Sequence, residues 1–245
     1  MKKTFMTAVI YLVLTGLMFT NMSCNSPSND ESEAESGNSA SDIKGEIIAL
    51  PEPETDGEMS LESAIYSRIS RRDFSDKPMD EKEISQLLWA SQGIGVDGIT
   101  GASRTAPSAG ATHPFDVYLV AGNIDNIIAG IYQYNYETHE LTLIRENDCR
   151  EELAAAALSQ GFIASAPASI ILVADYSRTT GRYGERGEIY VHMEAGNISQ
   201  NIHLQAEALN LGTVVIGAFN NAELKRIMQT EDTPLIIMPV GHLEL

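Results

Sequence analysis

Positively charged residues are scarce in this chain of 245 residues, where 16 lysines and arginines stand against 34 aspartates and glutamates and leave a formal net charge of −18. Proteins that bind nucleic acid neutralise its phosphates with cations clustered over a broad face. The acidic balance therefore argues against nucleic acid as a partner. The length suffices for one sizeable domain, and the sequence shows no internal repeat.

Cysteine is scarce too, because Cys24 and Cys149 are the only two in the chain. Only Cys149 lies in the part that is predicted to fold, so that part cannot form an internal disulfide even in an oxidising compartment. Its neighbours Asp148 and Glu151 are acidic. Negative charge close by keeps the proton on a thiol, so we expect no nucleophilic role for Cys149.

The motifs of several common enzyme classes are missing. The sequence has no phosphate-loop lysine motif, no Gly-x-Ser-x-Gly elbow after a strand and no pair of histidines at the spacing of a helical metal site. We therefore predict no metal site. Residues 93–98 match the glycine pattern of a dinucleotide-binding turn, but they follow an amphipathic helix and not a strand. We interpret them as the end of that helix and the start of a loop.

The N-terminus has the pattern of a bacterial export signal. Lys2 and Lys3 precede an apolar run over residues 5–19. Ser23 followed by Cys24 resembles the lipobox of bacterial lipoproteins, in which the cysteine is lipidated and becomes the new N-terminus. We therefore predict a signal peptide over residues 1–23 and a lipid anchor on Cys24 that holds the protein at the cell envelope, in the periplasm or at the outer membrane. A secreted protein without lipid, or an uncleaved anchor, are the alternatives.

The segment that follows is acidic and polar. Residues 25–60 contain ten acidic residues, and Lys44 is their only cationic counterweight. Such a composition cannot bury a core. We therefore predict a disordered tether over residues 24–59 and a folded domain over residues 60–245.

Apolar periodicity divides the domain into helices and strands. Helices are predicted to begin at Ser60, paired with Ser63 or with Glu62, and at Asp80, and to cover residues 151–158, 187–211 and 222–228. Strands are predicted over residues 117–121, 131–134, 141–144, 169–174, 213–218 and 235–240. Residues 93–110 are predicted as loop. This mixture indicates an α+β layered domain. The apolar residues of the long helix 187–211 are not confined to one stripe, so we expect the core to cover one side and a second subunit another.

A cluster of arginines, Arg68-Ile69-Ser70-Arg71-Arg72, stands out against the acidic background. In an extended segment alternate side chains point the same way, so Arg68, Ser70 and Arg72 would converge on one target while Arg71 points away in a structural role. Two guanidinium groups and a hydroxyl suit a phosphate. The alternative is a solvated loop in which the arginines pair with nearby aspartates.

Two further stretches could approach a ligand with their backbone. Residues 104–114 place small residues between Pro107 and Pro114, with Ser108 and Thr112 as possible hydrogen-bond donors. Taken alone this stretch is an ordinary tight loop. Residues 217–220 follow a predicted strand, where free backbone N–H groups could face a ligand.

Together these stretches carry a resemblance that none carries alone. The run Arg-x-Ser-x-Arg-x-Phe from Arg68, PSAGATHP from Pro107, GRYGERG from Gly181 leading into EAGNISQNIHLQAEALNLG, and VVIGAF from Val214 resemble, in this order, the motifs of the nitroreductase-like FMN flavoproteins. Within that family they resemble the SagB-type dehydrogenases, whose best-known members oxidise azoline rings in peptide natural products. The resemblance extends over residues 60–241.

The resemblance implies a fold and a cofactor site. The fold is a nitroreductase-like sandwich of a mainly antiparallel sheet with flanking helices, and the long helix lies centrally at the interface of a homodimer that shares two FMN sites. Arg68, Ser70 and Arg72 would hold the phosphate and ribityl region. The isoalloxazine ring would be lined from the partner subunit by Pro107, Ser108, Ala109 and Gly110, with Gln160 as a polar contact and with Gly217, beside Ala218, offering its N–H near flavin N5.

The resemblance also implies chemistry. Tyr183, Arg186 and Tyr190 are the candidates for proton handling or substrate orientation. Ring-oxidising members use a Lys–Tyr pair near the flavin, whereas here Arg182 precedes Tyr183 and no lysine is present at the start of the long helix.

The function predicted on this basis is an FMN-dependent oxidoreductase that acts outside the cytoplasm and transfers a hydride between flavin N5 and a small organic substrate. Free NAD(P)H is expected to be scarce there. Two alternatives are an NAD(P)H-dependent nitro or quinone reductase with an unprocessed N-terminus, and a flavin-binding lipoprotein without catalytic activity.

Overall fold

A computed structural model describes residues 45–98 and 101–244 of the chain. The predicted signal peptide, the predicted lipidation site Cys24 and the predicted tether up to residue 44 lie outside these residues. Within the described part, no helix is both long and apolar enough to cross a membrane.

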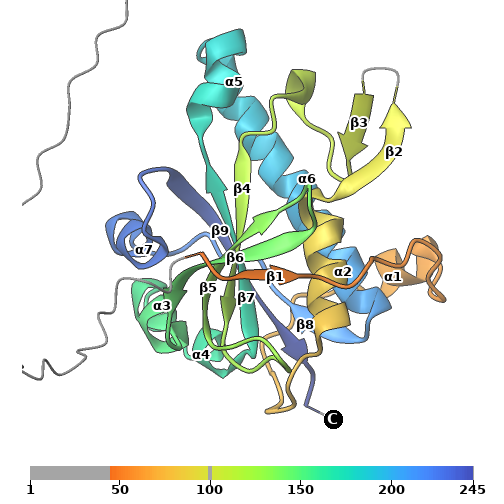
Figure 1. Ribbon diagram of the computed structural model, residues 1–245, viewed down its shortest axis with the longest axis vertical. Coiled ribbons are helices and arrows are strands. Elements are labelled where there is room, and N and C mark those ends of the chain that lie inside the picture. Colours follow the sequence, from red (N-terminus) through yellow and green to blue (C-terminus); the bar gives the residue numbers. More distant parts are fainter. Residues whose placement is uncertain (1–44, 99–100, 245) are drawn as a thin grey trace, which may run out of the picture. The chain divides into compact units, whose positions relative to one another are not determined.

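The framework of the domain is a sheet of seven strands in the order β1-β6-β5-β4-β7-β9-β8. Every neighbouring pair in this sheet is antiparallel. The strands are β1 (Ile47–Ala49), β4 (Phe115–Ala121), β5 (Gly130–Asn135), β6 (Glu140–Glu146), β7 (Ala168–Ala174), β8 (Leu211–Thr213) and β9 (Thr233–His242) (Figure 1). The mainly antiparallel sheet that the sequence predicts is therefore confirmed.

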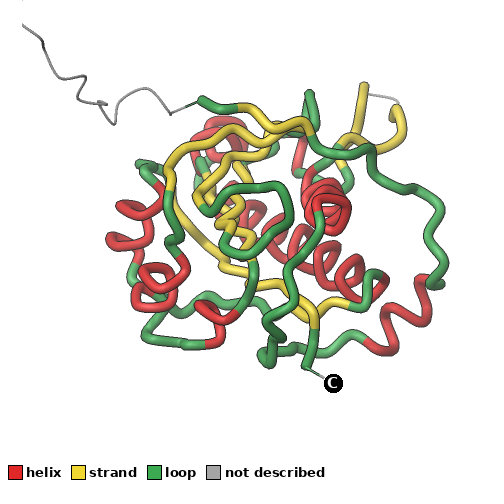
Figure 2. Tube along the Cα trace, turned by 60° about the horizontal axis from the view of Figure 1, so that its bottom comes forward, coloured by secondary structure: helices red, strands yellow, loops and turns green. Residues whose placement is uncertain are grey.

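Helices cover both faces of this sheet, as Figure 2 shows in a second view. The helices of the domain are α1 (Leu61–Ser67), α2 (Glu81–Gln92), α3 (Arg150–Ala156), α4 (Phe162–Ser165), α5 (Tyr176–Tyr183), α6 (Arg186–Ala208) and α7 (Asn221–Met228), with a short 3-10 turn η1 (Ala109–Ala111). Buried residues of α2 and α6 belong to one hydrophobic cluster, and those of α3, α4 and α7 belong to another. The predicted α+β class is confirmed as two helical layers around one sheet.

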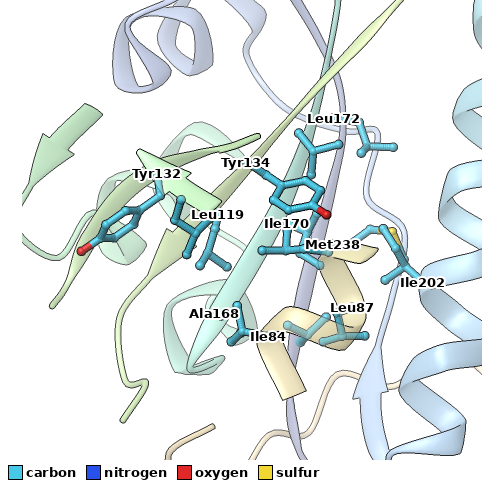
Figure 3. Packing of buried hydrophobic residues seen from close by; sticks show 14 of the residues in the cluster. Ile84, Leu87, Leu119, Tyr132, Tyr134, Ala168, Ile170, Leu172, Ile202 and Met238 are labelled. Atoms are coloured by element: carbon cyan, nitrogen blue, oxygen red, sulfur yellow. The ribbon is translucent and has the colours of Figure 1, made fainter. Parts of the chain in front are cut away.

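The two clusters arise because successive side chains of a strand point to opposite faces. In β4, Leu119 belongs to the α2–α6 side, whereas Tyr118 and Val120 belong to the α3–α7 side. Figure 3 shows the first cluster, in which Leu87 of α2 and Ile202 of α6 are drawn with residues of the sheet. The central strands are buried on both sides, which explains their almost unbroken apolar sequence.

Two predicted helix starts are confirmed by their caps. The Ser60 hydroxyl accepts a hydrogen bond from the Ser63 N–H at 3.2 Å and begins α1. Asp80 and Glu83 form a reciprocal capping box at the start of α2, with distances of 2.8 and 2.9 Å. These caps satisfy backbone donors that a helix start leaves free.

The long helix is confirmed, but its predicted end at Leu211 is wrong. The structure has α6 over 23 residues and ends it at Ala208, after which Asn210 takes a left-handed backbone with φ 57°. Leu211 then belongs to β8, which pairs with β9. The strand predicted over residues 213–218 is also wrong in its extent. Strand β8 ends at Thr213, and beyond it only an isolated bridge from Ile216 to Ile237 continues the pairing with β9.

The predicted loop over residues 93–110 contains a β-hairpin. Its strands β2 (Ile94–Gly98) and β3 (Gly101–Arg104) pair antiparallel and form a sheet of their own. The indole N–H of Trp89, in the last turn of α2, donates to the Ile94 carbonyl at 3.0 Å. Gly93 ends the helix as predicted, but the glycines that follow it lie in paired strands.

The predicted extent of the tether is also wrong, because its last part is folded onto the domain. Strand β1 pairs with β6 and forms one edge of the sheet, and Leu50 is 8 % exposed and packs in the main core. The backbone of Glu54 exchanges two hydrogen bonds of 2.8 Å with the side chain of Gln86. The acidic composition of this segment predicts disorder. It does not reveal the fold, because the few apolar residues are stabilised by contacts with residues far away in the sequence.

Candidate functional site

The arginine segment, residues 68–72, follows α1 and contacts β8. The Arg71 N–H donates to the Thr213 carbonyl at 3.0 Å. Arg68 is half-buried, and Ser70 and Arg72 are exposed. The Arg71 guanidinium Nε lies 3.5 Å from the buried carboxylate of Glu207 in α6. Arg71 therefore has a structural partner on α6, and the charge of Arg68 acts on buried His203 of the same helix. The convergence of Arg68, Ser70 and Arg72 on one target stays a prediction.

Arg72 lies beside Phe162, two residues after the predicted cofactor residue Gln160. Its guanidinium carbon is 5.8 Å from the centre of the Phe162 ring in α4. Two residues before Phe162, the side-chain amide of Gln160 donates to the Ala218 carbonyl at 3.4 Å. Gly217 and Ala218 are exposed, so the Gly217 backbone is accessible to a ligand. We call Arg68, Ser70, Arg72, Gln160, Gly217 and Ala218 the anchor group.

The predicted ring-binding loop, residues 107–110, packs on α5. Gly110 has φ 60°, a left-handed conformation that favours glycine, and a Cβ at this position would overlap the hydroxyl of Tyr183. The Arg182 guanidinium donates to the Gly110 carbonyl at 3.0 Å. Glycine at position 110 thus lets the loop lie directly against Tyr183.

The three predicted catalytic residues lie together next to this loop. The rings of Tyr183 and Tyr190 meet edge to face, with centres 5.1 Å apart and an angle of 89° between their planes. The Arg186 guanidinium carbon is 5.7 Å from the centre of the Tyr190 ring. We call these three residues and residues 107–110 the loop–α5 group.

Within one chain, the anchor group and the loop–α5 group lie apart and do not form one site. Figure 1 shows α5, which carries Tyr183, at one end of the domain, and α4, which carries the Phe162 neighbour of Arg72, toward the other. The resemblance to the flavoproteins assigns residues 107–110 to the FMN of the partner subunit. The separation of the two groups within one chain agrees with that assignment.

A buried polar network, which the sequence reasoning missed, lies behind the loop. Glu194 of α6 is buried and accepts a hydrogen bond of 3.3 Å from the Gln92 amide, whose oxygen accepts one of 3.1 Å from Arg104. Burial raises the pKa of Glu194, and hydrogen bonds from Ser108 and Gln92 and the charge of Arg104 oppose this rise. A carboxyl group on the apolar side of a helix was the signal in the sequence that could have revealed it.

His113 completes the loop and was also missed as a site residue. Its backbone N–H donates to the Ser108 hydroxyl at 2.8 Å, and its backbone is left-handed with φ 43°. The imidazole Nδ1 is buried without a hydrogen-bond partner among the described residues. Burial, and secondarily the charge of Arg104, lower the pKa of His113 to about 4. The imidazole is therefore uncharged at neutral pH, and the loop carries no cation of its own.

The donor set fits FMN better than a metal. Arg68, Arg72 and Ser70 would hold a phosphate, the small residues of the loop would approach a flat ring, and the Gly217 N–H would be available to it. In the described ranges, no cluster of histidine, cysteine, aspartate and glutamate has the geometry of a metal site.

Comparison with known proteins places this fold and these motifs in a family. The family model of the nitroreductases matches residues 65–242. A protein of the archaeon Methanocaldococcus jannaschii that is described as a nitroreductase is 41% identical over 195 residues, which are 80% of this chain and 96% of that protein. The crystal structure of a Ralstonia eutropha protein that is described as a nitroreductase superposes with a TM-score of 0.71 and 31% identity over 81% of this chain and 90% of that one.

The fold is thus that of an α+β oxidoreductase, and the chain belongs to the nitroreductase family. Members of this family typically bind FMN and commonly dimerise. A more distant similarity, 23% identity over 191 residues, links the chain to the trifolitoxin operon protein TfxC of Rhizobium leguminosarum, of which it covers 54%. This similarity is to the SagB-type branch.

Proposed function

We propose that this protein is an FMN-dependent oxidoreductase that transfers a hydride between flavin N5 and a small organic substrate. The observation that carries the proposal is the anchor group, in which Arg68 and Arg72 flank Ser70 in the sequence and Arg72 lies beside Phe162, two residues after Gln160, whose side chain contacts Ala218. FMN, when bound, supplies the hydride chemistry, and the protein orients it and sets its electrostatic surroundings.

The side chains of the chain would divide this work. Arg68, Ser70 and Arg72 bind the phosphate and the ribityl chain. The Gly217 N–H donates a hydrogen bond toward N5, which favours the electron-rich reduced ring. Tyr183 and Tyr190, with Arg186 beside them, orient the substrate or move a proton at their hydroxyl groups.

We propose a homodimer, in which the loop–α5 group of one chain completes the anchor group of the other. Exposed apolar residues support a second subunit: Tyr66 of α1 is 93% exposed and has Leu61 and Ile65 on the same helix, while Ile189 and Met193 are exposed on α6. Burial of apolar surface is the main force in such an association. Light scattering of the purified domain gives the mass directly, and a monomer that retains FMN would contradict the shared site.

The test of the cofactor is a flavin spectrum of the purified protein, followed by release and identification of the bound flavin. Arg72→Ala is expected to lower FMN retention about tenfold or more, because a guanidinium–phosphate pair is a strong, charge-assisted contact. If neither wild type nor apoprotein binds FMN, the proposed function is wrong.

We further propose that the protein acts at the cell envelope, anchored through lipidated Cys24, as the sequence pattern of residues 1–24 predicts. Electrons would then come from an organic substrate or a membrane-linked donor. The mass of the mature N-terminus and cell fractionation test this proposal. A mature protein that begins with Met1 would reject it.

The identity of 41% with a protein described as a nitroreductase favours a second function, an NAD(P)H-dependent nitro or quinone reductase. The similarity to TfxC favours the SagB-type branch instead. Anaerobic titration with NADH, NADPH and reduced quinones, followed by flavin bleaching, decides between the donors. A protein that binds FMN but turns over with no donor would be the non-catalytic flavin-binding lipoprotein.

A further inference from the structure

Glu207 is a charged residue in an unusual position. It lies in the last turns of α6 and is 9% exposed, although a buried carboxylate is unfavourable unless it is paired. One of its oxygens, Oε1, faces two groups of the arginine segment: the Ile69 N–H donates to it at 3.4 Å, and the Arg71 guanidinium Nε lies 3.5 Å away.

These two contacts act on the segment that carries the phosphate ligands of the proposed site. Ile69 lies between Arg68 and Ser70, and Arg71 lies between Ser70 and Arg72. Fixing the backbone at position 69 and the side chain at position 71 therefore restricts the movement of the residues between and beside them, at positions 68, 70 and 72.

The charges around Glu207 divide the three arginines into two kinds. Arg71 forms an ion pair with Glu207, whereas in the described part of the chain neither Arg68 nor Arg72 has a carboxylate within ion-pair distance. One helical turn before Glu207, His203 is buried; burial and then the charge of Arg68 lower its pKa, and Glu207 opposes this, so the imidazole is uncharged at neutral pH. The cations left for a phosphate are Arg68 and Arg72.

We propose that Glu207 is a positioning residue for the phosphate anchor: it contacts the main chain at Ile69 and the guanidinium of Arg71, and thereby fixes the segment that presents Arg68, Ser70 and Arg72 to the FMN phosphate. This inference rests on the proposed FMN site. Glu207 does not touch the phosphate, since two anions in contact repel each other. Its effect reaches the ligand only through the segment that it holds.

Riboflavin provides the decisive comparison, because it has the ring and the ribityl chain of FMN but no phosphate. The experiment measures the dissociation constants of FMN and riboflavin by quenching of flavin fluorescence on the full apoprotein, for the wild type, Glu207→Ala and Glu207→Gln. Glu188→Ala, which removes an exposed carboxylate of the same helix, is the matched control.

For Glu207→Ala we expect the FMN dissociation constant to rise about tenfold, and that of riboflavin to stay within about twofold. Glutamine keeps an oxygen that can accept from the Ile69 N–H but loses the charge, so Glu207→Gln should raise the FMN constant only about threefold. The glutamine variant also tests the proposal if Glu207→Ala does not fold. The Glu188→Ala control should bind both flavins as the wild type does.

Three results would overturn the inference. An equal loss of FMN and riboflavin affinity would mean a purely structural role, and tighter FMN binding in Glu207→Gln would mean that the carboxylate opposes the phosphate. If Arg68→Ala and Arg72→Ala weaken FMN but both Glu207 variants bind it normally, the positioning role alone fails. If the wild type does not prefer FMN over riboflavin, the phosphate site itself, and with it the proposed function, is wrong.

Discussion

The uncharged imidazole of His113 leads to a quantitative prediction about acid stability. Its pKa in the folded protein is lowered to about 4 from an ordinary value of 6.5. One pKa unit corresponds to about 1.4 kcal/mol, so full protonation of His113 in the unfolded chain alone shifts the free energy of unfolding by about 3 kcal/mol. That is a large fraction of the stability of a domain of this size.

The sign follows from proton uptake. Below pH 6.5 His113 is protonated in the unfolded chain, whereas in the folded protein it stays unprotonated until the pH approaches 4. Folding is therefore opposed progressively as the pH falls through this window, and the loss stays constant below it. His113→Asn removes the titrating group and keeps a residue that tolerates a left-handed backbone.

The assay is urea unfolding of the wild type and His113→Asn at pH 7.5, 6, 5 and 4.5. Other groups titrate in both proteins, so the difference between the two free energies of unfolding isolates His113. We expect the wild type to lose about 2.5 kcal/mol relative to the variant between pH 7.5 and 4.5. A difference that does not change with pH would refute the reasoning, because His113 would then have the same pKa in the folded and unfolded states.

Three further predictions follow from the packing. Gly110→Ala should lower stability by only about 1 kcal/mol but turnover by about tenfold or more in a steady-state assay, because the new methyl group displaces Tyr183. Leu50→Ala should destabilise by about 2 kcal/mol in urea, whereas Ile47→Ala, at a residue 60% exposed, should stay within about 0.5 kcal/mol; equal effects would contradict the fold of this segment. The Cys149 thiol, buried and with a pKa raised by burial, should react with a thiol reagent about 10³-fold more slowly in native protein than in urea.

Local signals carry most of what the sequence predicts correctly about the fold. A cap such as Ser60 or Asp80 acts within three residues, so its effect is visible in the sequence beside it. The unbroken apolar run of β7 likewise shows that both of its faces are covered. These elements fold as predicted because their stabilising groups lie next to one another along the chain.

The mistakes lie where stability comes from distant partners. Strand β1 has three residues in an acidic stretch, and it exists because Ile47 to Ala49 pair with residues 140–142. No average over its neighbours reveals this pairing. The hairpin β2–β3 is rich in glycine, and its composition is that of a loop until the Trp89 contact and the antiparallel pairing are known.

The same distinction separates the predicted site residues from those that were missed. A family resemblance names the groups that would touch a cofactor, such as Arg68 and Arg72, because their motif is compact in the sequence. Glu207 holds that motif from 138 residues away from Ile69, and Glu194 meets Gln92 from 102 residues away. Such supporting groups have no motif of their own.

They do leave one trace in the sequence. Along α6 the buried face includes Val191, Ala195, Ile198, Ile202 and Ala206, and both Glu194 and Glu207 are buried on the same helix. A carboxyl group among apolar residues of a covered helix must find a hydrogen-bond donor or a cation in another element. Because cations are scarce in this chain, only a few arginines can be the cationic partner of such a carboxyl group. The acidic composition makes the fold of residues 45–59 hard to predict, but it helps to identify which charged contacts stabilise the proposed site.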